Sequence, residues 1–126
     1  MLGTYALSAG YYDAYYLQAQ RVRTKIKNEF DEALKKVDCI LTPTSPHVAF
    51  NIGEKSNDPL AMYLEDIFVT GASLAGLPAI SLPAGFYEGL PIGMQLISQR
   101  FAEQILFQLG NQFQQLTTFH LNKPKL

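Results

Sequence analysis

The chain has 126 residues, 48% of them hydrophobic, and a formal net charge of −1 at pH 7. A charge so near zero gives no electrostatic footprint for direct binding to nucleic acid or an acidic membrane, and no apolar stretch reaches the ~20 residues that a membrane span needs. The single cysteine excludes an internal disulfide and fits a reducing compartment.

The first part of the chain is predicted to be helical. Residues 2–9 have the pattern of a helix end that stops at Gly10, and because this pattern begins at Met1 itself, we expect a longer chain upstream. A second helix is predicted from about Tyr12 to Val37, since apolar residues recur there every three or four positions. These residues are Tyr15, Ala19, Val22, Ile26, Phe30, Ala33 or Leu34, and Val37.

The middle of the chain predicts a short strand, a loop and a helix start. Cys39–Thr42 is apolar enough for a buried strand, and residues 43–57 are expected to form a long loop. Asp58-Pro59 indicates a helix start, because Asp accepts backbone N–H bonds as N-cap and Pro fits the first helical position. A short helical turn over about Ala72–Ala75 is expected to end at Gly76.

The last third predicts two strands and a helix. Ala79–Leu82 and Ile92–Ile97 are apolar runs bounded by Gly and Pro, with a Gly-rich loop expected between them, and a helix is predicted over about Ala102–Leu116. Helices alternating with strands indicate an α/β layered architecture. Sheets average about five or six strands, so the three predicted here form an incomplete sheet whose other strands would come from upstream.

The search for catalytic side chains finds little. Ser73, in Gly71-Ala-Ser-Leu-Ala75, falls one residue short of the G-x-S-x-G elbow, and a plain helical serine is the favoured interpretation. His47 and His120 lie far apart with no ligand-type residue at metal-site spacing, so we interpret them as surface or loop histidines. Cys39 is predicted to be a buried structural thiol.

Two dense groups of side chains are interpreted as structural. Tyr11-Tyr-Asp-Ala-Tyr-Tyr16 could stack on a base, but on a helix these rings spread around the circumference, which favours packing. The four basic residues Arg21, Arg23, Lys25 and Lys27 are followed by acidic residues that cancel the charge, so we expect a solvated face.

Asp66 is the charged residue that most needs an explanation. It is expected near the C-terminal end of a short helix, where the helix dipole disfavours a carboxylate. It also precedes Ile67-Phe-Val69, which we expect to be buried, so it needs a cationic partner. From the residues alone, a structural ion pair with Arg or Lys is favoured over a cationic ligand.

Several motifs carry a family resemblance that runs along essentially the whole chain. Leu74-Ala-Gly-Leu-Pro-Ala79 and Gly89-Leu-Pro-Ile-Gly-Met-Gln-Leu-Ile97 resemble the C-terminal part of the amidase-signature enzymes. Gly10-Tyr-Tyr-Asp-Ala-Tyr-Tyr16 and Asp58-Pro-Leu-Ala-Met-Tyr63 point to the tRNA-amidotransferase branch of that family.

The resemblance implies a mixed central β-sheet covered by helices and a Ser–Ser–Lys triad, whose motifs lie upstream of anything present here. Residues 1–126 are therefore expected to be the C-terminal portion of a single amidase domain, inactive alone. The family's acidic residue for the α-amino group of glutamine matches Asp66, which reverses the preference above. The arginine for the substrate carboxylate is expected just before Met1. Gly71 and Ser73 stand where many relatives carry Pro and Asn.

For the whole enzyme, the resemblance implies glutamine hydrolysis in the cytoplasm. The implied partners are the B and C subunits of the amidotransferase. Ammonia would pass to the B subunit, which uses ATP and Mg²⁺ to amidate Glu-tRNA(Gln), while the small C subunit helps to hold the complex. This chain would need no cofactor and would meet tRNA only through the complex, with no membrane. The alternatives are part of another amidase-signature hydrolase, a non-catalytic module that binds a partner, or a remnant without a folded product.

Overall fold

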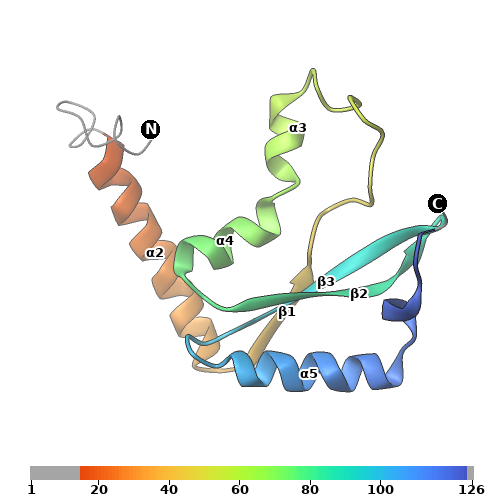
Figure 1. Ribbon diagram of the computed structural model, residues 1–126. Helices are drawn as coiled ribbons and strands as arrows, with labels where there is room; N and C mark the ends of the chain where they lie inside the picture. The colour runs from red at the N-terminus through yellow and green to blue at the C-terminus, as the bar shows by residue number, and fades with distance from the viewer. Residues whose placement is uncertain (1–14, 125–126) are drawn as a thin grey trace.

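The computed structural model describes residues 15–124, so the helix predicted over residues 2–9 and its stop at Gly10 lie outside the described part. None of the described helices is long and apolar enough to cross a bilayer. Figure 1 shows the elements in chain order, which are α2 (Leu17–Leu34), β1 (Cys39–Pro43), α3 (Pro59–Leu64), α4 (Ile67–Ala75), β2 (Ala79–Tyr87), β3 (Leu90–Ser98), α5 (Glu103–Leu116) and the 3₁₀ turn η2 (Phe119–Leu121).

The strands form one antiparallel sheet in the order β1-β3-β2. Because side chains alternate along a strand, Met94 and Leu96 of the central strand face the same way as Leu82, which pairs with Met94. These three side chains pack with Leu106 of α5 in a buried apolar cluster. Helix α5 therefore covers one face of the sheet (Figure 1).

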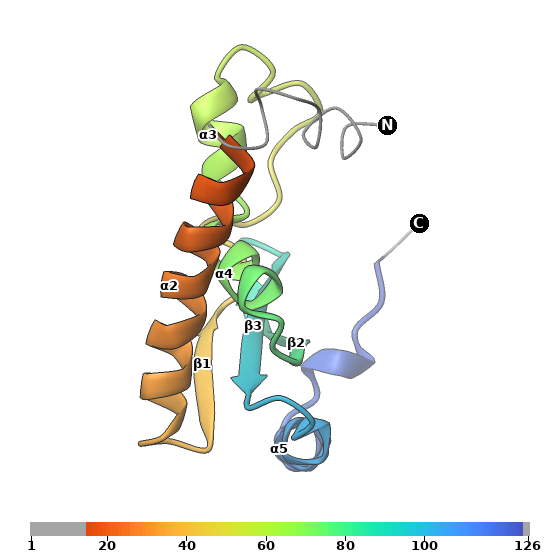
Figure 2. The ribbon, with the colours of Figure 1, turned by 90° about the vertical axis from the view of Figure 1, so that its left-hand side faces the viewer.

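The other face of β3 is turned toward α4 and α2 (Figure 2). Ile97 on this face is only 1% exposed. Gln95, also on this face and buried, donates from Nε2 to the carbonyl oxygen of Phe68 in α4 at 2.9 Å. Helices thus lie on both faces of β3, and the predicted α/β layering is confirmed, with an antiparallel arrangement of the three strands that this chain contributes.

The loop predicted between the last two strands is wrong. Strands β2 and β3 continue to Tyr87 and Leu90, which pair directly across a two-residue turn. The turn residues Glu88 and Gly89 both have positive φ, 51° and 80°, as a tight hairpin with the twist of the strands requires. A register shift between Pro83 and Gly85 marks a bulge, where a strand accommodates both residue types.

The helix predictions are confirmed in kind and corrected in extent. α5 has nearly the predicted bounds, α2 ends at Leu34 before the predicted Val37, and α4 is longer than the predicted turn at Ala72–Ala75. The predicted start of the α2 helix at Tyr12 lies outside the described residues. Gly76 ends α4 in the left-handed conformation at φ 69°. Asp58 caps α3 as predicted, because its Oδ1 accepts from the backbone N–H of Ala61 at 3.0 Å.

Two arginines hold the C-terminal end of α4. Arg23 of α2 donates from Nε to the carbonyl oxygen of Leu74 at 2.7 Å, and Arg100 donates from Nη2 to that of Ala75 at 2.6 Å. Cations are favourable at this end of a helix because the carbonyl groups there lack helical partners. Arg23 is exposed as expected, but it also has a structural role that the sequence did not indicate.

Gly93 is the glycine of β3 where a side chain has no room. An added Cβ would lie 2.8 Å from Thr44 Oγ1, and Thr44 is held in place by a 2.8 Å hydrogen bond between Oγ1 and Ser81 Oγ. We expect Gly93→Ala to lower the free energy of unfolding of the full-length protein by about 1–3 kcal/mol, as measured by urea unfolding. The matched control is Gly85→Ala, because a Cβ there would have no atom of residues 15–124 within 4 Å. Equal losses for both variants would contradict this explanation of the glycine.

Candidate functional site

Asp66 lies at the junction between α3 and α4. It follows Glu65, the C-cap residue of α3, so its predicted place near the end of a short helix is confirmed, but a second helix that the sequence did not place there begins at the next residue. α3 ends at Leu64, and Asp66 is the N-cap residue of α4, so the positive end of the α4 dipole favours its carboxylate. Its backbone oxygen accepts from Thr70 N at 3.0 Å and from Thr70 Oγ1 at 2.9 Å. The first turn of α4 therefore fixes the backbone of Asp66.

The carboxylate of Asp66 is exposed and makes no side-chain cap bond. Within residues 15–124, the structure gives it no hydrogen bond or ion pair, so the structural ion pair that the residues alone favoured is not formed. Ile67 is 55% exposed, which corrects the expectation that residues 67–69 are buried. The carboxylate is thus available to a cation that this part of the chain does not supply.

Glu65, the preceding residue, has a basic side chain and a histidine as partners, whereas Asp66 has none within the described residues. Its Oε1 atom accepts from Nζ of Lys55 and contacts Nδ1 of His47 at 2.9 Å. The Glu65 and Lys55 side chains are only 14% and 16% exposed, and Lys55 Nζ lies 4.3 Å from the centroid of the Phe50 ring. The loop 44–57 is therefore fastened to the α3–α4 junction by a well-covered ion pair.

The electrostatics of this junction keep Glu65 ionised. The hydrogen bond from Lys55 is the main cause that lowers the pKa of the Glu65 carboxyl, desolvation opposes it, and His47 adds to the lowering. An ionised carboxylate only accepts hydrogen bonds, which assigns the proton in this contact to Nδ1 of His47. His47 is exposed as expected. Its partner Glu65 lies 18 residues further along the sequence, and at that separation the spacing of the two residues does not predict a contact.

The other candidates from the sequence do not gather into a catalytic group. Ser73 is an exposed residue inside α4 and not in a loop. Cys39 is half-buried in β1, and burial raises the pKa of its thiol, as expected of a structural cysteine. His120 lies in η2 with a buried Nδ1 that has no hydrogen-bond partner among the described residues. In the described part of the chain, no three His, Cys, Asp or Glu side chains stand close enough to hold a metal ion.

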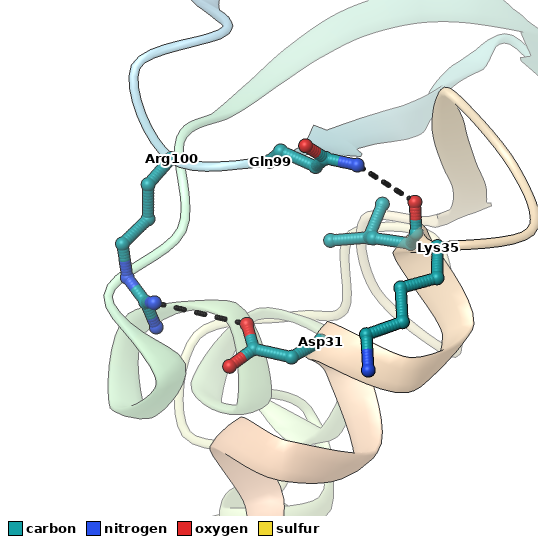
Figure 3. Close-up of a pocket in the computed structure, with 5 residues that line it drawn as sticks. Asp31, Lys35, Gln99 and Arg100 are labelled. Carbon is teal, nitrogen blue, oxygen red and sulfur yellow. Dashed lines mark hydrogen bonds and ion pairs between the residues drawn. The ribbon is translucent and has the colours of Figure 1, made fainter.

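A hollow between the end of α2 and the β3–α5 connection is lined by polar side chains (Figure 3). Gln99 donates from Nε2 to the carbonyl oxygen of Leu34 at 2.8 Å, and Arg100 Nη1 lies 3.7 Å from Asp31 Oδ1. Because these groups bond to one another across the hollow, we interpret it as a joint between elements and not as a ligand site.

Gly71 and Ser73, which depart from the family pattern, belong to helix α4. A Cβ on Gly71 would lie 3.2 Å from Cε2 of Phe30, so the glycine allows α4 to approach the Phe30 ring of α2. The departure at Gly71 therefore lies in the contact between α2 and α4, and not at the α3–α4 junction where Asp66 stands.

Comparisons with known proteins agree with the motifs. The family model described as Amidase matches residues 1–107. The A subunit of the glutamyl-tRNA(Gln) amidotransferase of Hahella chejuensis is 60% identical over all 126 residues, and that of Moorella thermoacetica is 57% identical. The chain spans 26% of the length of both relatives.

Solved structures give the same result. The A subunit of the glutamyl-tRNA(Gln) amidotransferase of Thermotoga maritima superposes with a TM-score of 0.73 at 56% identity, over 85% of this chain and 24% of that one. A 6-aminohexanoate cyclic dimer hydrolase superposes with a TM-score of 0.76 over 94% of this chain and 26% of that one, but at 21% identity it shows the fold alone. With the family model matched along most of its length, the chain belongs to the amidase family.

Proposed function

We propose that this chain forms the C-terminal portion of the glutamine-hydrolysing subunit of a glutamyl-tRNA(Gln) amidotransferase. The observation that carries the proposal is that more than half of the residues are identical, over the whole chain, to the A subunits of that enzyme. An amide hydrolase of another kind in the same family is less well supported, because the 6-aminohexanoate cyclic dimer hydrolase shares only the fold at 21% identity.

The exposed apolar side chains support the proposal that these residues are part of a larger domain. Large apolar residues stand in solvent on three helices, although a protein surface rarely carries extensive apolar patches without a partner. They include Val22 on α2, Leu60, Met62, Tyr63 and Leu64 on α3, and Phe107 and Leu116 on α5. In the proposed domain, the catalytic portion with the Ser–Ser–Lys triad would cover them.

In the proposed reaction, Asp66 holds the α-ammonium group of glutamine. Its carboxylate is exposed, lacks a cationic partner within residues 15–124, and is fixed through its backbone at the start of α4. An ionised carboxylate only accepts hydrogen bonds, and with an ammonium group it forms a charge-assisted hydrogen bond. Asp66 would therefore orient the substrate while the residues that attack the amide stand in the other portion of the domain.

The rest of the proposal concerns the assembly. Ammonia released from glutamine would pass to the B subunit, which activates Glu-tRNA(Gln) with ATP and Mg²⁺, and the C subunit would help to hold the two together in the cytoplasm. This chain would contribute no ligand to ATP or Mg²⁺, and it would meet tRNA only through the complex.

A chimera tests the proposed function. In it, the 126 matching residues of the Hahella chejuensis A subunit are replaced by this chain, and the product is assembled with the partner subunits of that organism. We expect the chimera to release ammonia from glutamine at a rate within about tenfold of the parent enzyme, and the isolated 126-residue chain to release none above a buffer control. An assembled but inactive chimera, or turnover by the isolated chain, would contradict the proposal.

A further inference from the structure

We propose that Glu65, Lys55 and His47 form a clamp that positions Asp66 for the substrate ammonium group. This inference rests on the proposed function and adds three residues to it, none of which touches the substrate. The clamp consists of these three side chains. Glu65 precedes Asp66 directly in the chain, so a change in the backbone at one residue moves the other.

Among residues 15–124, α3 has few other contacts that hold its end in place. The helix has six residues and none of them is buried, and helices this short are unstable without tertiary contacts. The contacts of Glu65 Oε1 with Lys55 and with His47 Nδ1 join the end of α3 to the loop 44–57. The clamp therefore fixes the side of the junction that precedes Asp66.

The side of the junction that follows Asp66 is fixed independently. Phe68, in the first turn of α4, accepts a 2.9 Å hydrogen bond from Nε2 of Gln95, which is 5% exposed in the central strand. Asp66 thus stands between two anchored points, one on the sheet and one on the loop. Removing the clamp would break the contacts with the loop and leave the hydrogen bond between Gln95 and Phe68 in place.

The start of the loop is bonded to the sheet, so the clamp joins Glu65 to the sheet through the loop. Thr44 N donates to the carbonyl oxygen of Gly93 at 3.0 Å, and Ser45 Oγ donates to the carbonyl oxygen of His47 at 2.6 Å. At the other end of the loop, the ring of Phe50 lies against Lys55. A continuous series of contacts thus runs from β3 through the loop to Glu65.

Such positioning matters because a charge-assisted hydrogen bond depends steeply on distance and angle. A displacement of about 1 Å in a group that orients the substrate can reduce the rate as much as 100-fold. A clamp variant should therefore impair recognition of the α-ammonium group, while leaving the distant groups that attack the amide in place.

The test uses the chimera and two substrates, glutamine and 4-carbamoylbutanoate, which is the same amide without the α-amino group. The quantity measured is the discrimination, the ratio of kcat/KM for glutamine to kcat/KM for 4-carbamoylbutanoate. Asp66→Asn sets the reference, with a fall in discrimination of about 10- to 100-fold. We expect Glu65→Ala and Lys55→Ala to lower the discrimination about 3- to 10-fold, mainly through KM for glutamine.

Two further variants separate positioning from general damage. Lys55→Arg keeps a cation that can pair with Glu65 and interact with an aromatic ring, so it should retain most of the discrimination that Lys55→Ala loses. Glu54→Ala is the matched control, because in the described part of the chain the Glu54 carboxylate accepts hydrogen bonds only from Asn51 of the same loop. This variant should leave the discrimination at the parent value.

The outcomes distinguish the two proposals. A loss of discrimination in Asp66→Asn, Glu65→Ala and Lys55→Ala, with recovery in Lys55→Arg, supports the clamp. A loss in Asp66→Asn alone, or a fall in kcat on both substrates without a change in their ratio in the clamp variants, overturns the clamp and leaves the proposed function standing. Unchanged discrimination in Asp66→Asn overturns the contact between Asp66 and the ammonium group, and the clamp with it.

Discussion

Replacing Asp66 by asparagine in the chimera is expected to lower kcat/KM for glutamine by about 10- to 100-fold, the value of a lost charged hydrogen bond. The substitution keeps the size and the backbone of the residue, whose carbonyl oxygen still accepts from Thr70. It removes the negative charge that would face the substrate ammonium group, so KM for glutamine should rise. Steady-state ammonia release at several glutamine concentrations measures both constants.

The control for this variant is Asp38→Asn. Asp38 is an exposed residue between α2 and β1, far in the sequence from the α3–α4 junction. It undergoes the same change in charge and should keep the kinetic constants of the parent chimera. If Asp38→Asn and Asp66→Asn had the same effect, the loss would be one of net charge and not of a substrate contact.

Ile97→Ala is expected to be the most destabilising single change described for the sheet. Ile97 is 1% exposed and lies on β3, between β1 and β2, opposite both Ile40 and Ala79. Truncating a fully buried isoleucine removes apolar contacts and leaves a cavity, which costs about 2–5 kcal/mol. Urea unfolding of the full-length protein, followed by circular dichroism, should show this loss.

Ile52→Ala provides the matched comparison for that loss. Ile52 belongs to the loop 44–57 and is fully exposed, so its truncation should change the free energy of unfolding by no more than about 0.5 kcal/mol. A small effect of Ile97→Ala, equal to that of Ile52→Ala, would mean that the central strand is not the core of this portion.

The ends of a strand could be predicted from the sequence where a proline stands at the end of the strand. They could not be predicted where glycine and proline, which are typical of turns, lie within the strand. Cys39–Thr42 was bounded by a proline at the end of the strand, and the structure extends it only to Pro43. Pro83, Gly85 and Gly89 have the composition of a loop, yet the first two lie at a bulge and only Gly89 belongs to the turn. Composition alone does not distinguish a bulged hairpin from two strands with a loop.

In the site, too, the features that depend on neighbouring residues could be predicted, and the contacts between residues far apart in the sequence could not. Asp66 could be selected because its sequence neighbours and the family motif both single it out. Its place after a short helix was predicted, but the start of α4 at Ile67 was not, because apolar residues on both sides of Asp66 hide the break between the two helices. The clamp could not be found at all, because Lys55 and His47 meet Glu65 only after the loop has folded back. Their residue types are those of an ordinary solvated loop.

The most direct measurement is a crystal structure of the assembled chimera with glutamine bound and its nucleophilic serine replaced by alanine. We predict the α-amino nitrogen of glutamine within about 3.2 Å of a carboxylate oxygen of Asp66, with Glu65 still joined to Lys55. A glutamine whose α-amino group is held by other residues, with Asp66 in solvent, would contradict the proposed role of Asp66.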